Sequence, residues 1–148
     1  YLNKTVAEDW SALRQEAMAL LQEESGLQEI VSLVGIDALS EKDRLKLEVA
    51  KSIREDYLQQ NGFHEIDTYT SLDKQYKMLK LVLLFRHEAE RALDAGVYLD
   101  KVLALEVRDK IARSKYIHED DIAKMDDIAA ELRADIDTLI NEGGVLNA

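Results

Sequence analysis

The chain contains no proline in 148 residues, so it lacks the residue that most often ends or kinks a helix. Long stretches are rich in Ala, Leu, Glu, Lys and Gln, which are strong helix formers, and their apolar residues recur at steps of three and four. The length suits one hydrophobic core rather than two. The sequence therefore predicts an all-α fold, a single bundle of about five to six helices over residues 1–142, followed by a frayed tail at 143–148.

Glycines and capping residues set the expected helix boundaries. Gly26 and Gly35 are expected to end helices, Gly35 by taking a left-handed backbone conformation, and Ser40 and Ser71 are expected N-caps. Residues 63–70 lack a helical period and predict an ordered aromatic loop. The expected helices cover residues 6–24, 27–34, 40–61, 71–96, about 99–114 and about 118–142.

The charge balance excludes several classes of partner. There are 30 acidic against 19 basic residues, for a net charge of -11. Such a surface repels phosphate backbones and anionic lipid headgroups, so we expect neither nucleic acid nor direct membrane insertion. The longest strongly apolar run, Leu79 to Phe85, is far shorter than the ~20 residues that span a bilayer.

The cysteine count and the N-terminus indicate context. The chain has no cysteine, which excludes a disulfide framework and favours a reducing compartment, so we expect a cytoplasmic location. It begins with Tyr1 and has no signal-peptide pattern. We therefore expect it to be a piece of a longer protein.

Signals of catalysis are missing. The chain has no phosphate-binding glycine loop of the G-x-x-x-x-G-K-[ST] type. His64, Glu65 and Asp67 are close in sequence but match no recognised ligand spacing, so we predict no metal site. His87 lies on a charged helix face and His118 at a helix start, where structural or exposed roles are expected. We predict no catalytic residue in this fragment.

Two stretches suggest a function more strongly. The first is the corner, residues 35–43 with the sequence GIDALSEKD, which we expect to be exposed, with Leu39 among its charges. Ser40 is expected to cap the next helix by accepting a hydrogen bond from the amide of Asp43, while Glu41 and Asp43 favour the helix dipole. The second stretch is the aromatic loop, which carries Phe63 and Tyr69.

Both stretches resemble a known family. LQEIVSLVGIDALSEKDRLKLEVAKSIREDYLQQNGFHEIDTY, residues 27–69, resembles the C-terminal helical domain of the catalytic A (alpha) subunit of prokaryotic A/V-type rotary ATPases. DALSEKDRL also resembles the DELSEED corner of the related F-type beta subunit, and YLQQNGF resembles that subunit's helix end. The resemblance continues through KQYKMLKLVL, residues 74–83, and weakens after about Ala95.

This resemblance implies two sites. In the family, the corner leans on the central rotor, and an aromatic residue after the helix end packs on the adenine ring. Phe63 matches the adenine-packing residue, with Gly62 beside it and Tyr69 at the second aromatic position. Ala38 and Lys42 replace glutamates of the F-type motif, which changes the charge of the corner. The acidic residues Asp37, Glu41 and Asp43 would favour a basic rotor, while a steric push could suffice to transmit force. The implied rotor-contact residues are Asp37, Ala38, Leu39, Ser40, Glu41, Lys42 and Asp43.

The resemblance also implies a context for the parent protein. That parent would hydrolyse or synthesise ATP, bind ATP or ADP with magnesium, and couple the reaction to ion transport. Its partners would be non-catalytic B subunits and central-stalk subunits, and it would lie on the cytoplasmic side, peripheral to the membrane. The fragment alone lacks the phosphate-binding loop and should be inactive. The alternative is a free-standing acidic helical adaptor that binds a partner helix and no nucleotide.

Overall fold

The computed structural model describes residues 4–58 and 72–147, and every regular element in these ranges is helical. The predicted all-α bundle is therefore confirmed. Its α-helices are α1 (Lys4–Val34), α2 (Glu41–Ser52), α4 (Leu72–Asp94), α5 (Leu99–Leu103), α6 (Glu106–Arg113) and α7 (Lys124–Asn147). Shorter turns are 3₁₀-helices at Ile36–Ala38 (η1), Ser114–Tyr116 (η4) and Glu119–Asp121 (η5), and a π-helix at Ile53–Leu58 (η2).

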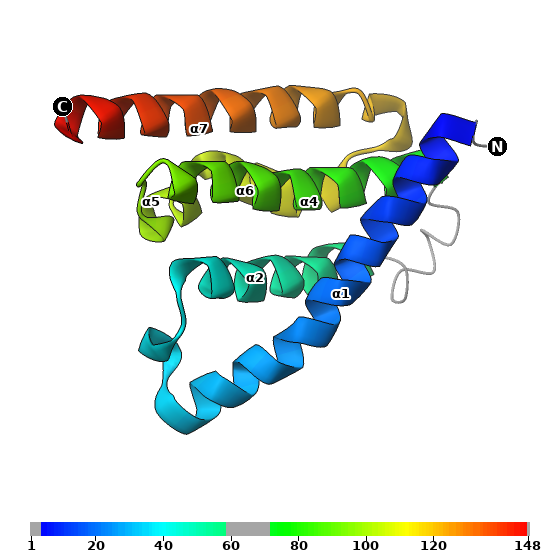
Figure 1. Cartoon of the computed structure of the whole chain (residues 1–148). Coiled ribbons are helices and arrows are strands. Elements are labelled where there is room, and N and C mark those ends of the chain that lie inside the picture. The colour runs from blue at the N-terminus through cyan, green and yellow to red at the C-terminus, as the bar shows by residue number, and fades with distance from the viewer. Residues whose placement is uncertain (1–3, 59–71, 148) are drawn as a thin grey trace.

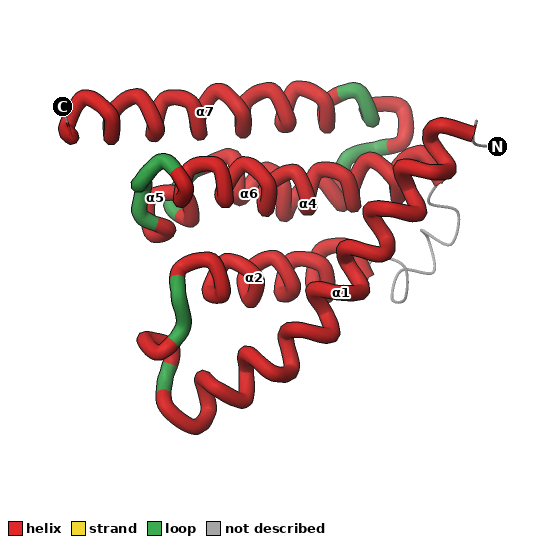
Figure 2. The backbone as a smooth tube through the Cα atoms, viewed as in Figure 1, coloured by secondary structure: helices red, strands yellow, loops and turns green. Residues whose placement is uncertain are grey.

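The helix α4 occupies the centre of the bundle. It packs against α7 on one side and α2 on the other, so the three helices lie in successive layers (Figure 1). The long helix α1 crosses these layers obliquely and contacts both α2 and α4. As Figure 2 shows, the corner joins α1 to α2 at the end of the molecule opposite the N-terminus.

The core follows the predicted apolar stripes. Leu45, Val49 and Ile53 on the α2 side meet Leu79 and Leu83 of α4, and each is at most 1% exposed. Spacing of three and four residues aligns such side chains on one helix face, as the helical period of the sequence predicts. The largest fully buried side chains are Leu20, Leu45, Ile53, Leu79, Leu83, Leu99, Leu132, Ile136, Val49, Val102 and Val107.

Gly26 does not end a helix, contrary to the prediction. The helix α1 runs through it from Lys4 to Val34, so the separate helix expected at residues 27–34 is part of α1. A glycine inside a helix costs only about 1 kcal/mol relative to alanine. Glu24, two residues before Gly26, binds Arg54 of η2, and Gln28, two residues after Gly26, donates a hydrogen bond to Glu24. Those tertiary contacts offset the local preference of glycine.

The other helix ends that the sequence predicted are confirmed only in part. Gly35 and Gly96 both have positive φ, 96° and 92°. Gly35 has ψ 162°, which is an extended conformation open mainly to glycine rather than the left-handed helical one we expected. The ends expected at Asn61-Gly62 and the cap at Ser71 lie outside the described residues.

The C-terminal third is divided differently from the prediction. The single helical stretch expected at 99–114 is two helices, α5 and α6. The last helix begins at Lys124, after the η5 turn, rather than near His118. The expected stop at Gly143-Gly144 is also wrong, because α7 continues to Asn147. The segment expected to fray therefore begins as a continuation of α7.

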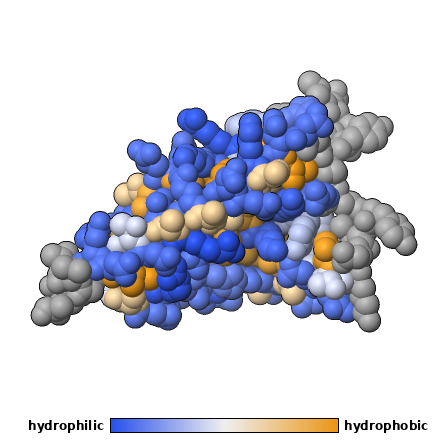
Figure 3. Space-filling view, turned by 90° about the horizontal axis from the view of Figure 1, so that it is seen from above, coloured by the Kyte–Doolittle hydropathy of each residue, from blue (hydrophilic) through white to orange (hydrophobic). Residues whose placement is uncertain are grey.

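The visible surface matches the composition. Seen from the α7 side, hydrophilic residues predominate, with narrow strips of hydrophobic residues between them (Figure 3). Within the two described ranges, no helix is both long enough and apolar enough to cross a membrane.

Candidate functional site

The corner is a tight turn between two helices. The amide of Gly35 donates to the carbonyl of Val31 at 2.9 Å, and Leu39 donates to Ile36 at 3.1 Å across η1. Ser40 then has an extended backbone, and its side chain accepts a hydrogen bond from the amide of Asp43 at 3.1 Å. The predicted N-cap is confirmed. It satisfies an amide that has no partner within the helix and fixes where α2 starts.

Removing this cap gives a first prediction. Ser40→Ala should lower the free energy of unfolding by about 1 kcal/mol, because the amide of Asp43 loses its acceptor. Ser32→Ala is the matched control, since Ser32 is exposed on α1 and alanine is the better helix former there. Urea unfolding of both variants measures the difference. Equal stability of the two variants would contradict a role for the cap.

Leu39 is buried, contrary to the prediction of an exposed residue among charges. Its side chain is only 8% exposed. The turn η1 packs back against α1, and the extended backbone of Leu39 (φ -88°, ψ 143°) follows that turn. Leu39 therefore anchors the corner in the bundle and presents little surface to a partner.

Sequence reasoning missed the apolar residues that are exposed beside the corner. We call Ile30, Leu33, Val34 and Ile36 the apolar tip. Their exposed fractions are 41%, 76%, 69% and 42%, respectively. The sequence does contain a signal for this exposure. The apolar residues in the last turn of α1 point in several directions, and one buried face of the helix cannot accommodate them all.

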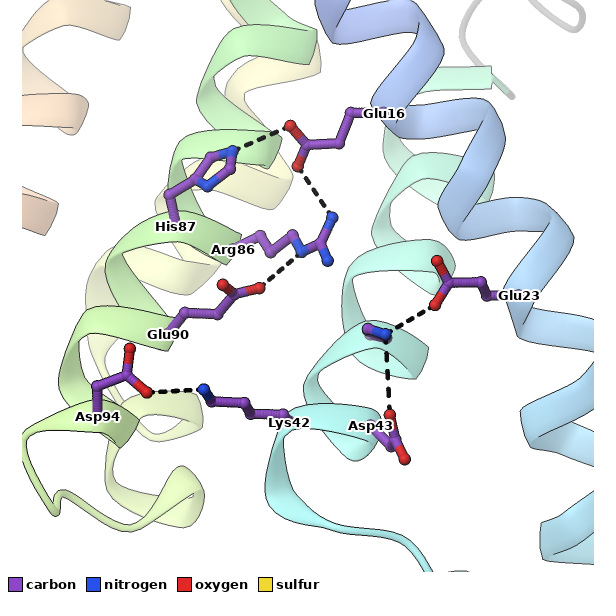
Figure 4. Close-up of polar contacts among 9 residues, drawn as sticks. Glu16, Glu23, Lys42, Asp43, Arg86, His87, Glu90 and Asp94 are labelled. Carbon is purple, nitrogen blue, oxygen red and sulfur yellow. Dashed lines mark hydrogen bonds and ion pairs between the residues drawn. The ribbon is translucent and has the colours of Figure 1, made fainter.

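Most charges of the corner bind other parts of the same chain. A carboxylate oxygen of Glu41 accepts a hydrogen bond from the amide of Leu99 at 3.3 Å. The ammonium group of Lys42 lies 2.7 Å from a carboxylate oxygen of Asp94 (Figure 4), and that hydrogen bond raises the pKa of Lys42. These contacts tie the start of α2 to the end of α4 and the start of α5.

The remaining charged side chains at and beside the corner differ in how closely they approach an oppositely charged group. Asp43 lies 3.9 Å from Lys46, which also binds Glu23 of α1 at 2.8 Å (Figure 4). Arg44 lies 3.7 Å from Asp100. Asp37 makes no hydrogen bond or ion pair with another residue of the described ranges. The acidic residues expected to attract a rotor are thus largely occupied within the domain.

A polar cluster joins α1 to α4 farther from the corner. Glu16 accepts a hydrogen bond from Arg86 at 3.1 Å and lies 3.0 Å from the Nε2 atom of His87 (Figure 4). Arg86 also donates to Glu90 at 2.8 Å. Together with the corner contacts, this cluster connects α1, α2 and α4 along one side of the bundle. His87 thus has a structural contact, as expected.

The π-helix η2 is held by a nearly buried carboxylate. Glu24 of α1 is 8% exposed and accepts hydrogen bonds from Arg54 at 2.7, 3.0 and 3.2 Å. On the other side of η2, Lys115 lies 3.0 Å from Asp56. The element that precedes the aromatic loop is therefore fixed at two points. Gly62, Phe63 and Tyr69 themselves lie outside the described residues.

In the ranges 4–58 and 72–147, no three His, Cys, Asp or Glu side chains gather as a candidate metal site. His64, Glu65 and Asp67 lie outside those ranges. The Nδ1 atom of His118 accepts a hydrogen bond from the amide of Asp120 at 3.1 Å, which is a local turn contact. A cleft of about 360 Å³ is lined by residues of α2, η2, α4 and α6, including Arg108. Arg108 forms an ion pair with Glu48, and its guanidinium carbon lies 5.9 Å from the centroid of the Phe85 ring.

Comparison with known proteins gives consistent relatives. The family model described as "C-terminal domain of V and A type ATP synthase" matches residues 1–103. A V-type ATP synthase alpha chain of Clostridium perfringens strain SM101 is 75% identical over 148 residues, which is 100% of this chain and 25% of that protein. V-type ATP synthase alpha chains of Clostridium botulinum are 72% identical over 149 residues (strain Eklund 17B) and 69% over 148 residues (strain Hall), with the same coverage.

These relatives bear on the two readings of the sequence. The chain spans about a quarter of the length of the relatives it matches, and the match includes the whole corner. They support the rotary ATPase interpretation and give no support to the free-standing adaptor.

Proposed function

The chain belongs to the family of C-terminal domains of V and A type ATP synthases, and we propose that it is the C-terminal domain of a catalytic alpha subunit that couples ATP turnover to rotation. The observation that carries this proposal is 75% identity over the entire chain to a V-type ATP synthase alpha chain. In this interpretation, ATP is hydrolysed or synthesised in the preceding part of the subunit. This domain transmits the resulting conformational change to a central stalk, whose rotation is coupled to ion transport.

The corner is the proposed contact with the central stalk. Transmission of force requires an element that moves as one body with its domain. The Ser40 cap, the Glu41 bond to α5 and the Lys42 pair with Asp94 support this role, because they tie the start of α2 to α4 and α5. Leu39 adds a buried anchor. Among the seven residues Asp37 to Asp43, some thus fix the corner to the rest of the domain, and others are accessible to a partner.

The second proposed site is the adenine pocket. Phe63 would stack on the base, with Gly62 allowing close approach and Tyr69 as a second aromatic. The groups that hold phosphate and magnesium would come from the preceding part of the subunit. The ties of η2 to Glu24 and Lys115 support the proposal, because η2 ends at Leu58, five residues before Phe63, and its attachment to the bundle would limit the positions of Phe63.

The proposed partners follow from the same reading. They are non-catalytic B subunits beside the alpha subunit and the subunits of the central stalk, with the complex peripheral to a membrane on its cytoplasmic side. ATP or ADP with magnesium is the proposed ligand of the whole subunit, while this domain alone supplies only the aromatic contact. The isolated domain is therefore expected to have no ATPase activity.

Cross-linking tests the coupling role. The chain contains no cysteine, so Asp37→Cys places a single thiol of this domain at the exposed corner. In the assembled ATPase, with a cysteine on the facing stalk helix, oxidation should cross-link the two and stop ATP hydrolysis, and a reductant should restore it. Tyr116→Cys is the control, at a side chain 73% exposed in η4. Absence of any cross-link between Asp37→Cys and the stalk would refute the proposal.

Substitution of the proposed adenine contact gives a further prediction. In the assembled ATPase, Phe63→Ala should raise KM for ATP and change kcat much less, because the ring contacts the base and not the reacting phosphate. Loss of one stacking contact, roughly 1–3 kcal/mol, corresponds to a rise in KM of roughly 5- to 150-fold. Tyr116→Ala, the control at an exposed aromatic, should leave KM unchanged. A decrease confined to kcat would count against the adenine role.

A further inference from the structure

A cleft lies between α4 and α7, along the first half of α4. The two helices pack against each other and run in the same direction (Figure 1). The cleft between them, which we call the α4–α7 cleft, has a volume of about 380 Å³. Its apolar lining includes the nearly buried side chains of Leu81 and Met125. Small-molecule sites in proteins measure roughly 300–1,000 Å³, so this cleft is large enough to hold a small ligand.

The α4–α7 cleft is positively charged in a strongly acidic chain. Lys77 and Lys80 of α4 and Arg133 of α7 line it, and Asp126 is the one carboxylate among the described lining residues. The lining therefore has three positive charges and one negative charge, whereas the chain as a whole has a net charge of -11. This local excess of positive charge favours an anionic ligand over a neutral or cationic one.

The cations of the cleft are weakly paired within the domain. The Nζ atom of Lys77 lies 3.9 Å from a carboxylate oxygen of Asp126, and the Nζ atom of Lys80 lies 3.9 Å from a carboxylate oxygen of Asp9. Both distances exceed that of a hydrogen bond. Arg133 makes no hydrogen bond or ion pair with another residue of the ranges 4–58 and 72–147. These three side chains therefore retain hydrogen-bond donors that a ligand can use.

Contacts with α1 hold Lys80 in place at the cleft. Its Nζ atom donates to the hydroxyl oxygen of Tyr76 at 3.2 Å. Tyr76 in turn donates to Asp9, and its ring stacks on the ring of Trp10 with 5.8 Å between centroids. Only one of the three ammonium donors of Lys80 is used in this way. A side chain that is already ordered loses less conformational entropy when it binds a ligand.

We propose that the α4–α7 cleft binds a small soluble phosphate monoester with a short apolar body. A phosphate monoester carries a charge of about -1.5 to -2 at pH 7, which complements the excess of two positive charges in the lining. Lys77, Lys80 and Arg133 donate charge-assisted hydrogen bonds to the phosphate oxygens. The apolar body lies over Leu81 and Met125, where its burial adds to the affinity.

This site is separate from the two sites of the proposed function. The corner contacts the far end of α4, at Asp94, whereas the cleft lies along the first half of that helix. The wall formed by α7 also lies beyond residues 1–103, which the family model matches. Failure of phosphate binding therefore leaves the coupling role of the corner standing.

Isothermal titration calorimetry of the 148-residue chain with octyl phosphate tests the site. Inorganic phosphate, which lacks the apolar body, and 1-octanol, which lacks the charge, are the comparison ligands. All titrations use one ionic strength, because salt screens exposed charges. Octyl phosphate should bind at one site per chain, and each comparison ligand should bind more weakly by about tenfold or more, because it makes only one of the two kinds of contact.

Substitutions locate the bound phosphate. Lys80→Gln with Arg133→Gln removes two exposed cations of the cleft and should weaken octyl phosphate binding by about tenfold or more. Lys101→Gln with Arg113→Gln is the matched control, since it removes one lysine and one arginine at exposed positions outside the cleft. This control should change the affinity by less than about twofold. Lys80→Arg with Arg133→Lys keeps both charges and should bind nearly as the unmodified chain does.

Several results would overturn the phosphate site. They are the absence of octyl phosphate binding, equal losses in the two glutamine pairs, and binding of 1-octanol as tight as that of octyl phosphate. Sedimentation with vesicles of phosphatidic acid distinguishes a soluble ligand from a membrane lipid. The chain should stay in the supernatant, because its net charge of -11 repels an anionic surface, and sedimentation with the vesicles would overturn the assignment to a soluble ligand. Equal urea midpoints of the unmodified chain and the variants exclude misfolding as the cause of a lost affinity.

Discussion

Leu83→Ala is expected to lower the free energy of unfolding by about 2–5 kcal/mol. Leu83 is fully buried in α4, the helix that packs against both α2 and α7. Truncation removes apolar contacts and leaves a cavity that the surrounding layers fill only in part. Because domains of this size are stable by about 5–15 kcal/mol, one such change removes a large share of the total.

Urea unfolding of the 148-residue chain measures this effect. The transition midpoint should fall while the slope of free energy against urea stays the same, because the native surface is nearly unchanged. Leu33→Ala is the matched control: the chemical change is identical, but Leu33 is 76% exposed, so its stability should stay within about 0.5 kcal/mol. If both variants lose the same stability, the assignment of α4 as the centre of the core is wrong.

The core was predictable because helical periodicity is a local property of the sequence. Leu79 and Leu83, four residues apart, share a face whatever the rest of the chain does, and both are buried. The Ser40 cap was predictable for the same reason, since it involves an amide only three residues away. Features that depend on neighbouring residues can thus be derived from the sequence alone.

Gly26 and Leu39 could not be placed in this way. The helical conformation at Gly26 depends on contacts that α1 makes with η2, more than twenty residues further along the chain. Leu39 is buried because η1 folds back onto α1, which no spacing rule contains. Tertiary packing decided both positions, and local propensity is only a weak guide when such packing competes with it.

The candidate site shows the same limit. The position of the corner could be predicted from its sequence motif. The partners of its charged side chains could not be predicted in this way. Glu41 binds the amide of Leu99, 58 residues away, and Lys42 pairs with Asp94. A list of acidic residues in the sequence suggested an electrostatic contact with a rotor. Glu41 and Asp43 are engaged within the domain, whereas Asp37 is not, and the spacing of the charges in the sequence did not reveal this difference.

Arg54→Ala is expected to lower the free energy of unfolding by about 1–3 kcal/mol, because it leaves the carboxylate of Glu24 buried with Gln28 as its remaining hydrogen-bond donor. The Glu24 hydrogen bond raises the pKa of Arg54, so the guanidinium group stays charged at all ordinary pH values. The side chain of Arg54 is 45% exposed, and water therefore reduces the loss below that of a fully buried pair.

Two comparisons separate this effect from the general loss of a surface charge. Arg113→Ala breaks an ion pair with Asp109 in which both side chains are mostly exposed, and it should cost less than about 1 kcal/mol. The double variant Glu24→Gln with Arg54→Ala should be more stable than Arg54→Ala alone, because no charge remains buried at α1. Since η2 connects α2 to the segment that carries Phe63, the proposed adenine role of that residue predicts that Arg54→Ala also raises KM for ATP in the assembled ATPase. Equal losses for Arg54→Ala and Arg113→Ala would mean that the Glu24 contact does not hold η2 in place.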